Sequence, residues 1–283
     1  MSAGFATWHA LVDLALAEDL GAGDITSLAT ISPDARADGV MIAKQDGVIS
    51  GIEVAAFVFE RIDPEVSFIA RVVDGATVKA GAEIASIEGN ARSVLAGERV
   101  ALNLLQRLSG VASLTARYVA EVKGTNASIV DTRKTTPGLR ALEKAAVRHG
   151  GGRNHRLGLS DGVLIKDNHL AAIGGDDRVT KAIQRAREHA PHTAKVEVEV
   201  TTLAEAREAA DAGADIIMLD NMSVEQMAEA VNVIAGRSLV EASGGVNLAS
   251  VRGIAGSGVD LISVGALTHS APALDISLKF VIR

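Results

Sequence analysis

The stretch KVEVEVTTLAEAREAADAGADIIMLDN, residues 195–221, decides the fold class of this chain. Val196–Val200 and Asp215–Leu219 are short aliphatic runs of the kind that form buried strands. The alanine-rich segment Leu203–Ala212 lies between them and predicts a helix. A strand, a helix and a second strand in this order predict two parallel strands joined by a right-handed crossover.

The same unit recurs along the chain from about residue 125. Aliphatic runs that predict strands occur at Ser128–Val130, Gly162–Ile165, Val196–Val200, Asp215–Leu219, Leu239–Ala242 and Leu261–Val264. Alternating strands and helices predict a parallel sheet. Because six such strands occur without a dinucleotide-binding fingerprint, we expect an α/β fold with a closed or nearly closed barrel rather than a doubly wound sheet.

The first hundred residues follow a different pattern. Apolar residues at three- and four-residue spacing predict helices at Ser50–Arg61 and Ala91–Leu108. Val66–Val73 and Glu83–Glu88 predict short strands beside glycine turns. We expect an α+β region here, and we expect the C-terminal segment Ala273–Arg283, which has no strand after it, to pack on that region.

Composition excludes several classes of protein. The 283 residues include no cysteine, so disulfides, thiolate metal sites and a cysteine nucleophile are excluded. The formal net charge of −7 argues against general nucleic-acid and anionic-membrane binding. The N-terminal stretch Trp8–Leu20 is acidic and amphipathic rather than basic and then apolar, so we expect a cytoplasmic protein without a secretory signal or a membrane span.

Polar residues follow every predicted strand of the second region. The groups at or after the strand ends are Asp131–Lys134, Lys166–His169, Glu197 and Glu199, Asp220–Asn221, Glu241–Gly245 and Ser263–Gly265. In β/α barrels the functional groups lie at the carboxyl ends of the strands and in the loops that follow. This pattern therefore predicts a site.

Positive charge is concentrated in one part of that region. From Asp131 to Lys166 eight basic residues stand against three acids, a local charge of +5 in a chain of −7. The basic residues are Arg133, Lys134, Arg140, Lys144, Arg148, Arg153, Arg156 and Lys166. Arginine suits carboxylates and phosphates because its planar fork matches two oxygens. Arg140, Lys144 and Arg148 are spaced four residues apart, so they could instead form a solvated face on the outside of a helix and have no part in anion binding.

Two further features belong to the predicted site. Side chains alternate along a strand, so Glu197 and Glu199 face the barrel interior if the valines of Val196–Val200 face the helices. Such acids form either a structural ion pair or a binding site for ribose hydroxyls or a divalent metal, and the spacing leaves both open. The turns Ser243–Gly245 and Ser263–Gly265 follow the last two strands, where barrels commonly hold a phosphate.

The chain resembles the quinolinate phosphoribosyltransferase family over nearly its whole length. The resembling blocks are AEDLGAGDITS from Ala17, GERVALNLLQRLSGVAS from Gly97, DTRKTTPGLRALEKAAVRHGGGRNHRLGLSDGVLIKDNH from Asp131, KVEVEV from Lys195, DIIMLDN from Asp215, EASGGV from Glu241 and ISVGALTHSAPALDISL from Ile262. The resemblance implies an incomplete (β/α) barrel with an N-terminal α/β sandwich-like domain. It implies domain limits of 1–108, joined by 270–283, and 109–269 for the barrel.

The resemblance also implies an activity and its residues. The family transfers phosphoribosyl from phosphoribosyl pyrophosphate (PRPP) to quinolinate with decarboxylation, using Mg²⁺. The implied substrate-binding residues are Arg99, Thr132, Arg133, Lys134, His155, Arg156, Lys166, Glu199, Asp220, Ser243, Gly244, Gly245, Ser263, Val264 and Gly265. The implied catalytic residues are Lys134, Lys166, Glu199 and Asp220, of which Glu199 and Asp220 meet Mg²⁺ indirectly, with PRPP.

Within this resemblance, Arg133, Lys134, His155 and Arg156 hold the quinolinate carboxylates. Arg99 reaches in from a neighbouring subunit of a homodimer or a higher homo-oligomer, although its place in the sequence alone indicates only a solvated helix face. Lys166 contacts PRPP.

Other functions stay open at this stage. One is a related ModD-type phosphoribosyltransferase of molybdate-transport operons with another acceptor base, and a more distant one is a nicotinate phosphoribosyltransferase. A barrel aldolase using Lys166 as a Schiff-base lysine would need an apolar pocket, which so many cations disfavour. The last alternative is a binding module that binds such ligands without catalysing a reaction.

Overall fold

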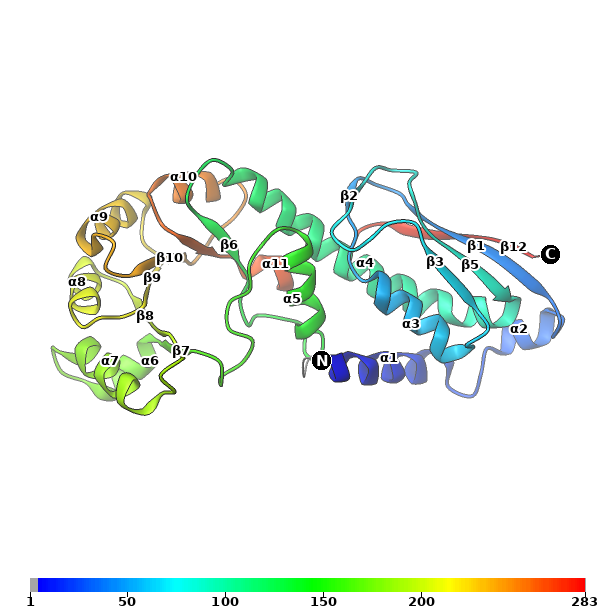
Figure 1. Cartoon of the computed structure of the whole chain (residues 1–283), viewed down its shortest axis with the longest axis horizontal. Coiled ribbons are helices and arrows are strands. Elements are labelled where there is room, and N and C mark those ends of the chain that lie inside the picture. The colour runs from blue at the N-terminus through cyan, green and yellow to red at the C-terminus, as the bar shows by residue number, and fades with distance from the viewer. Residues whose placement is uncertain (1–4, 283) are drawn as a thin grey trace. The chain divides into compact units, whose positions relative to one another are not determined.

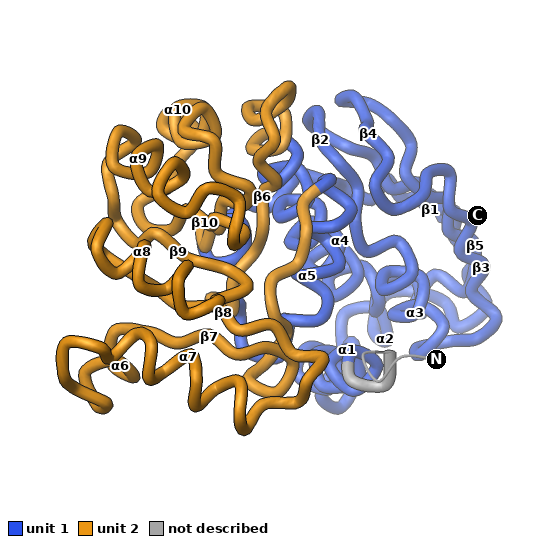
Figure 2. Tube along the Cα trace, turned by 60° about the vertical axis from the view of Figure 1, so that its left-hand side comes forward, with its two compact units in different colours: residues 1–116, 135–151, 267–283 blue, residues 117–134, 152–266 orange. Residues whose placement is uncertain are grey.

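The structure is a computed structural model that describes residues 5–282. The chain forms two compact units, shown in different colours in Figure 2. The first comprises Met1–Ala116, Thr135–Gly151 and Leu267–Arg283, and the second comprises Arg117–Lys134 and Gly152–Ala266. The limits expected from the sequence, 1–108 with 270–283 and 109–269, stay a prediction, and their residues 1–4 and 283 lie outside the described part.

The first unit is built on a four-stranded antiparallel sheet. Its order is β12 (Ile276–Ile282), β1 (Arg36–Ala43), β5 (Glu83–Asn90) and β3 (Ser67–Ala70). A separate pair joins β2 (Gly47–Val48) to β4 (Thr77–Val78). The helices are α1 (Phe5–Leu20), α2 (Ile25–Thr30), α3 (Ile52–Ile62), α4 (Ala91–Glu121), α5 (Arg140–His149) and α11 (Ala266–His269), of which α4 and α11 share residues with the second unit. Buried Met41, Phe59, Ile84 and Ile87 fill its core, which keeps the sheet on the helices.

The end of the chain pairs with a strand near its beginning. β12 runs antiparallel to β1, with Ile276 opposite Ala43 and Ile282 opposite Ala37 (Figure 1). The C-terminal segment therefore packs on the first unit, as its sequence predicts. Pairing with β1 gives β12 partners for its backbone groups that a lone strand would lack.

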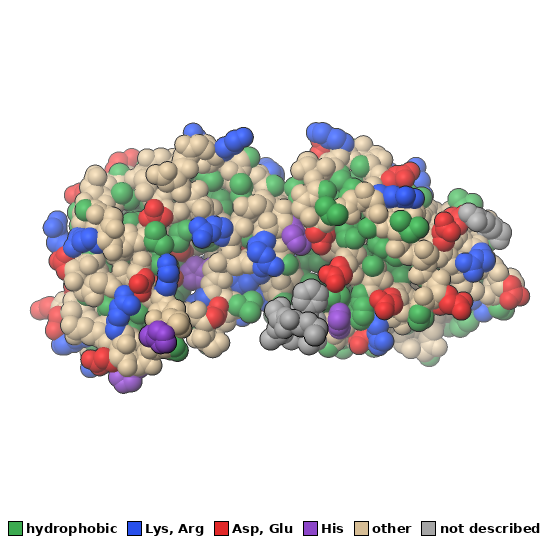
Figure 3. Space-filling model, in the orientation of Figure 1, with side chains coloured by type: hydrophobic (Ala, Val, Ile, Leu, Met, Phe, Trp, Pro, Cys, Tyr) green, Lys and Arg blue, Asp and Glu red, His purple; other side chains and the backbone are tan. Residues whose placement is uncertain are grey.

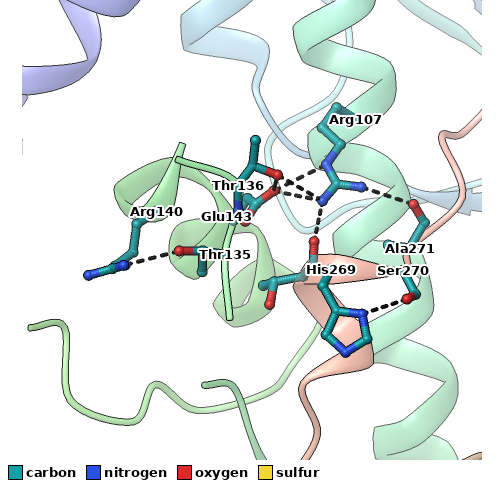
Figure 4. A network of polar contacts seen from close by, with 9 residues as sticks. Arg107, Thr135, Thr136, Arg140, Glu143, His269, Ser270 and Ala271 are labelled. Carbon is teal, nitrogen blue, oxygen red and sulfur yellow. Dashed lines mark hydrogen bonds and ion pairs between the residues drawn. The ribbon is translucent and has the colours of Figure 1, made fainter. Parts of the chain in front are cut away.

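A buried ion pair joins α4 and α5 within the first unit. Arg107 Nη2 lies 2.7 Å from Glu143 Oε1, and the Glu143 side chain has no exposed surface. Glu143 also accepts hydrogen bonds from the amide and the hydroxyl of Thr136, at 3.0 and 2.8 Å (Figure 4). Arg107 donates to the carbonyls of Thr268 and Ala271. The pair thus ties three separate segments together, and its remaining polar atoms are largely satisfied.

Lys144 lies beside Glu143 on α5 and is buried, whereas its spacing suggested an exposed position. Its residue is only 2% exposed, so the interpretation of Arg140, Lys144 and Arg148 as one solvated face is wrong at Lys144. Arg140 is partly buried, and its Nε donates to Thr135 Oγ1 at 2.9 Å (Figure 4). Arg148 is exposed.

The second unit is a six-stranded parallel sheet with the strand order of an opened barrel. The order is β6 (Ser128–Val130), β11 (Leu261–Ser263), β10 (Leu239–Ser243), β9 (Ile216–Asp220), β8 (Val196–Val200) and β7 (Val163–Ile165). Its helices are α6 (Asp167–Ile173), α7 (Arg178–His189), α8 (Leu203–Asp211), α9 (Val224–Ile234) and α10 (Val251–Gly256). No strand ladder joins β6 to β7 among the described residues, so the predicted incomplete (β/α) barrel is confirmed.

The helices of this unit cover the outside of the curved sheet, and the strands line its inside (Figure 1). Val196, Val198 and Val200 are at most 1% exposed, as expected for strand side chains packed under helices. Parallel order brings the carboxyl ends of all six strands to one edge, which places the loops that follow them together. Within residues 5–282, no helix is both long and apolar enough to cross a bilayer.

Candidate active site

A cavity of about 300 Å³ opens at the carboxyl ends of the strands in the second unit. Its lining residues are Thr132, Arg133, Lys134, His155, Arg156, Leu164, Lys166, Met218, Glu241, Ser243 and Ser263. Eight of these eleven are residues that the sequence analysis assigns to substrate. They come from the loop after β6, from the loop between α5 and β7, from the residue after β7 and from the last residues of β10 and β11. The structure therefore brings most of the predicted site into one cavity.

Cationic groups dominate the wall of this cavity. Arg133, Lys134, Arg156 and Lys166 line it together with His155. The pKa of Arg156 lies below its ordinary value, chiefly because of burial and next because of the positive charge of Arg133. Arg156 Nη1 donates to the Gly162 carbonyl at 3.0 Å, which fixes the guanidinium. Converging positive charges repel one another, so this arrangement favours a polyanionic ligand.

A buried carboxylate holds the loop that carries His155. Asp131 follows β6 and has no exposed surface. Its two oxygens accept from Asn154 Nδ2 at 2.6 Å and from the backbone N–H of His155 at 2.8 Å. The sequence analysis noted Asp131 at a strand end and gave neither Asp131 nor Asn154 a role. Their function is to position a binding loop.

Lys166 and Glu199 form a close ion pair at the cavity. Lys166 Nζ lies 2.6 Å from Glu199 Oε2, across the ends of the neighbouring strands β7 and β8. The Glu199 side chain is 11% exposed, whereas that of Lys166 is 46% exposed. Glu199 thus joins the cavity through a residue that lines it, although it is not itself part of the lining.

Asp220 ends β9 next to the cavity residue Ser243. The two residues are in register across β9 and β10. Asp220 Oδ2 accepts from Asn221 Nδ2 at 2.7 Å, and Asn221 has a left-handed backbone with φ of 54°. Gly244 makes this possible, because a Cβ there would lie 2.2 Å from Asn221 Oδ1. Gly244 is therefore required by a close approach of two strand ends.

The two predicted phosphate loops differ in their backbone conformation and in their hydrogen bonds. Gly244 and Gly245 have φ of 94° and 61°, a conformation that glycine adopts without strain. In the second loop, the Val264 amide donates to the Val130 carbonyl at 3.0 Å, and the Val264 side chain is buried. The Val264 amide is thus engaged inside the barrel, and the Ser263 hydroxyl donates to the Ala242 carbonyl at 3.3 Å.

A buried polar layer lies inside the barrel under the cavity. His155 Nε2 is 2.9 Å from Glu197 Oε2 and 3.8 Å from Glu241 Oε2. Glu197 and Glu241 are 4% and 0% exposed. Burial first, and then the charge of Glu197, raise the pKa of Glu241 to about 7. The valine–glutamate alternation predicts the inward Glu197. Glu241 was predicted only as one of the polar residues at a strand end, without a role of its own, because its neighbours come from other strands.

Arg99 lies on α4 in the first unit. Its side chain is 60% exposed, and its Nη2 is 3.9 Å from Glu98 Oε1. The cavity described above is lined by residues of the second unit alone. The role of Arg99 in a shared site thus stays a prediction.

Charge over the rest of the visible surface is mixed. On the face drawn in Figure 3, Lys and Arg side chains are interspersed with Asp and Glu among the described residues. This face therefore offers no broad basic patch in the described part of the chain.

Comparison with known proteins agrees with this geometry. A family model described as quinolinate phosphoribosyl transferase, C-terminal domain, matches residues 111–279, and the N-terminal domain model matches residues 24–109. The probable nicotinate-nucleotide pyrophosphorylase [carboxylating] of Synechocystis sp. is 45% identical, over 94% of this chain and 90% of that protein. The protein of the same name from Bacillus subtilis is 44% identical, over 92% and 89%.

Solved structures show the same likeness in three dimensions. NadC from Streptococcus pyogenes has a TM-score of 0.92 with 46% identity, covering 96% of each chain. The nicotinate-nucleotide pyrophosphorylase from Francisella tularensis also has a TM-score of 0.92, with 38% identity over 99% of this chain and 98% of that one. This chain therefore belongs to the quinolinate phosphoribosyltransferase family.

Proposed function

We propose that this chain transfers the phosphoribosyl group of PRPP to quinolinate, releasing pyrophosphate and CO₂ and forming nicotinate mononucleotide for de novo NAD synthesis. The observation that carries the proposal is the convergence of five basic side chains on one cavity of about 300 Å³ in a chain of net charge −7. Family membership supplies the reaction, and the cavity supplies the charge that its two anionic substrates require.

Quinolinate is a dicarboxylate and fits the Arg133 and Arg156 end of the cavity. Guanidinium forks bind carboxylates through two parallel hydrogen bonds. His155 and Lys134 lie on the same wall, and Thr132 Oγ1 accepts the Lys134 amide at 3.0 Å, which shapes the loop. These residues hold the acceptor with its ring nitrogen free to attack the ribose.

PRPP fits the remaining strand ends. Lys166 lines the cavity and is already paired with Glu199, so it offers its charge from a fixed position. Glu199 and Asp220 are suited to accept hydrogen bonds from ribose hydroxyls, and the loops Ser243–Gly245 and Ser263–Gly265 hold phosphate. Holding both substrates in one cavity brings the reacting atoms together.

Oxygen ligands are the donors that Mg²⁺ prefers, so the carboxylates of Glu199 and Asp220 fit such an ion together with PRPP. Both carboxylates end neighbouring strands and lie beside the cavity. Mg²⁺ held there would neutralise charge on the pyrophosphate of PRPP.

The decarboxylation needs no dedicated base. Once the ring nitrogen is alkylated, its positive charge stabilises the carbanion left when the 2-carboxylate departs as CO₂. The chain's own contribution is to hold that ring among cations and to keep its orientation. A nucleophile–base pair is accordingly not part of the proposal.

We also propose a homodimer or a higher homo-oligomer in which Arg99 of one subunit completes the site of another, and a cytoplasmic location. The support for the shared site is the resemblance of the Gly97–Glu98–Arg99 block together with the exposure of Arg99.

The test is incubation of the protein with PRPP, Mg²⁺ and either quinolinate or nicotinate as acceptor. Nicotinate mononucleotide and CO₂ should form with quinolinate, and no mononucleotide should form with nicotinate. Turnover of another base in preference to quinolinate would favour a ModD-type activity instead. Borohydride trapping of a carbonyl substrate on Lys166 would indicate an aldolase.

A further inference from the structure

The carboxyl group of Glu241 is buried in the barrel without a matching cation. Glu241 lies on β10, in register with Met218 of β9 and Leu261 of β11. It has no exposed surface, and neither of its carboxyl oxygens accepts a hydrogen bond within the described part of the chain. The Ser263 hydroxyl on β11 donates to the Ala242 carbonyl at 3.3 Å and also lies close enough to Glu241 to lower its pKa. A buried anion in such a setting would be costly.

The nearby His155 lies closer to the other buried acid, Glu197, than to Glu241. The backbone N–H of Arg156 donates to His155 Nδ1 at 2.8 Å, so Nδ1 uses its lone pair and the ring proton lies on Nε2. Nε2 is 2.9 Å from Glu197 Oε2 but 3.8 Å from Glu241 Oε2. His155 Nε2 is therefore closer to Glu197 than to Glu241, although it forms no hydrogen bond with either carboxylate.

The same proton argues against a metal ion at this cluster. One atom each of His155, Glu197 and Glu241 lies within 4.8 Å of the others, a spacing that a metal could use. A metal-binding imidazole presents a bare nitrogen to the ion and donates its other N–H to a neighbour. In this barrel the arrangement is reversed, because Nδ1 accepts and Nε2 carries the proton. The geometry of this cluster therefore fits a buried proton better than a metal ion.

The charges around Glu241 favour its neutral form. Burial and the neighbouring Glu197 raise the pKa of Glu241 to about 7, while the positive charges of His155 and Lys166 and the Ser263 hydroxyl act in the opposite direction. These are the charged and polar groups that face Glu241 from β8, from the loop before β7, from the end of β7 and from β11. The apolar Met218 faces it from β9. Two like charges this close and this buried do not both ionise readily.

We propose that Glu241 is a positioning residue that holds a proton inside the barrel, so that the buried cluster of His155, Glu197 and Glu241 carries one negative charge fewer beneath the acceptor. This inference rests on the proposed function only in assigning the acceptor to the His155 and Arg156 wall. Glu241 and His155 line the cavity above, and both also line a second cavity of about 330 Å³ on the other side of the layer. Loss of the proton would place a second negative charge directly under the cationic wall.

The first test needs no substrate. The carboxyl carbons of ¹³C-labelled glutamate are followed by NMR through a pH titration of the wild-type protein, of Glu241→Gln and of the exposed control Glu229→Gln. One carboxyl should titrate near neutral pH in the wild type and in the control and be missing in Glu241→Gln. If every glutamate carboxyl titrates in the ordinary acidic range, the inference is wrong, whatever the variants do.

The second test measures quinolinate binding by calorimetry between about pH 6 and about pH 8. Ionisation of Glu241 should weaken wild-type binding by about tenfold as the pH rises, because the added charge repels the dianion. Glutamine copies the neutral acid, so Glu241→Gln should bind within about threefold of the wild type at the lower pH and show no such decline. Loss of more than about tenfold at every pH would show that an anion is required.

A third measurement separates the proton from a metal. Mn²⁺ added to the free protein without PRPP should not change its melting temperature through this cluster, so wild type and Glu241→Gln should respond alike. Stabilisation by Mn²⁺ that is lost in Glu241→Gln would overturn the inference. If the wild type binds no quinolinate at all, the proposed function fails, and the NMR titration still decides the state of Glu241.

Discussion

Lys166 Nζ lies 2.6 Å from Glu199 Oε2, and the two residues stand at the carboxyl ends of the adjacent strands β7 and β8. Lys166 faces the cavity, whereas Glu199 is mostly covered. Glu199 therefore fixes the position of a cation that the proposed mechanism places against PRPP. The pair links the inward carboxylates predicted by Val196–Val200 to the basic cluster predicted from Asp131 to Lys166.

Replacing Glu199 with glutamine should lower kcat/KM for PRPP by about 100-fold, because the lysine loses its fixed position and the ribose loses an acceptor. Steady-state kinetics at varied PRPP measures this loss. The exposed pair Lys181–Asp177, 2.7 Å apart at the start of α7, provides the control, and Asp177→Asn should leave kcat/KM unchanged. Equal effects of the two substitutions would contradict the assignment.

Arg156→Ala should weaken quinolinate binding by about 100-fold while PRPP binding changes by less than about threefold, since the guanidinium serves one ligand only. Arg133→Ala should behave in the same way. Calorimetric titration with each ligand separately measures the difference, with the exposed Arg185→Ala as control. An equal loss of affinity for quinolinate and for PRPP would show that these arginines do not bind quinolinate alone.

Mixing inactive Arg99→Ala and Lys166→Ala subunits should restore part of the activity. If each site combines Arg99 of one chain with Lys166 of another, random mixing into dimers leaves roughly a quarter of the sites intact. The assay follows activity after the two variants are unfolded and refolded together, with each variant refolded alone for comparison. No recovery in a mixture that forms oligomers would exclude a shared site.

The stability of the wild type relative to Glu241→Gln should fall as the pH rises. The folded-state pKa of Glu241 is raised from an ordinary 4.5 to about 7, so the folded state holds the proton more tightly than the unfolded state. The stabilisation from the bound proton is complete below the pKa of Glu241 in the unfolded state. It is lost as the pH rises through the pKa of Glu241 in the folded state, and the free energy of unfolding then falls by at most about 1.4 kcal/mol per pH unit. Urea unfolding across this window measures the difference, and a constant or rising difference would contradict it.

Strand positions in the second unit could be predicted from sequence, whereas the length of α4 could not. Buried parallel strands appear as aliphatic runs, and all six predicted strands fall within about one or two residues of the observed bounds. The helix predicted at Ala91–Leu108 continues to Glu121, past Ser109 and Gly110. These two residues interrupt the pattern because of tertiary contacts. A Cβ on Gly110 would lie 2.1 Å from the Pro272 carbonyl, which is far away in sequence.

In the candidate site, too, some residues could be predicted from the sequence and others could not. Residues at strand ends could be predicted, because parallel strands bring their carboxyl ends to one edge. The roles of Asp131 and Glu241 could not, since they depend on partners from other segments that come together only in the fold. The buried Lys144 was missed for a related reason, because helical spacing alone does not say which face is covered.

The most direct test of the account is release of labelled CO₂ from quinolinate labelled in its 2-carboxylate. Labelled CO₂ should appear only when PRPP is present, in an amount equal to that of pyrophosphate and nicotinate mononucleotide. Arg156→Ala should abolish its release at moderate quinolinate concentrations. Pyrophosphate release without CO₂, or CO₂ release without PRPP, would contradict the central claim that this cavity joins the two substrates.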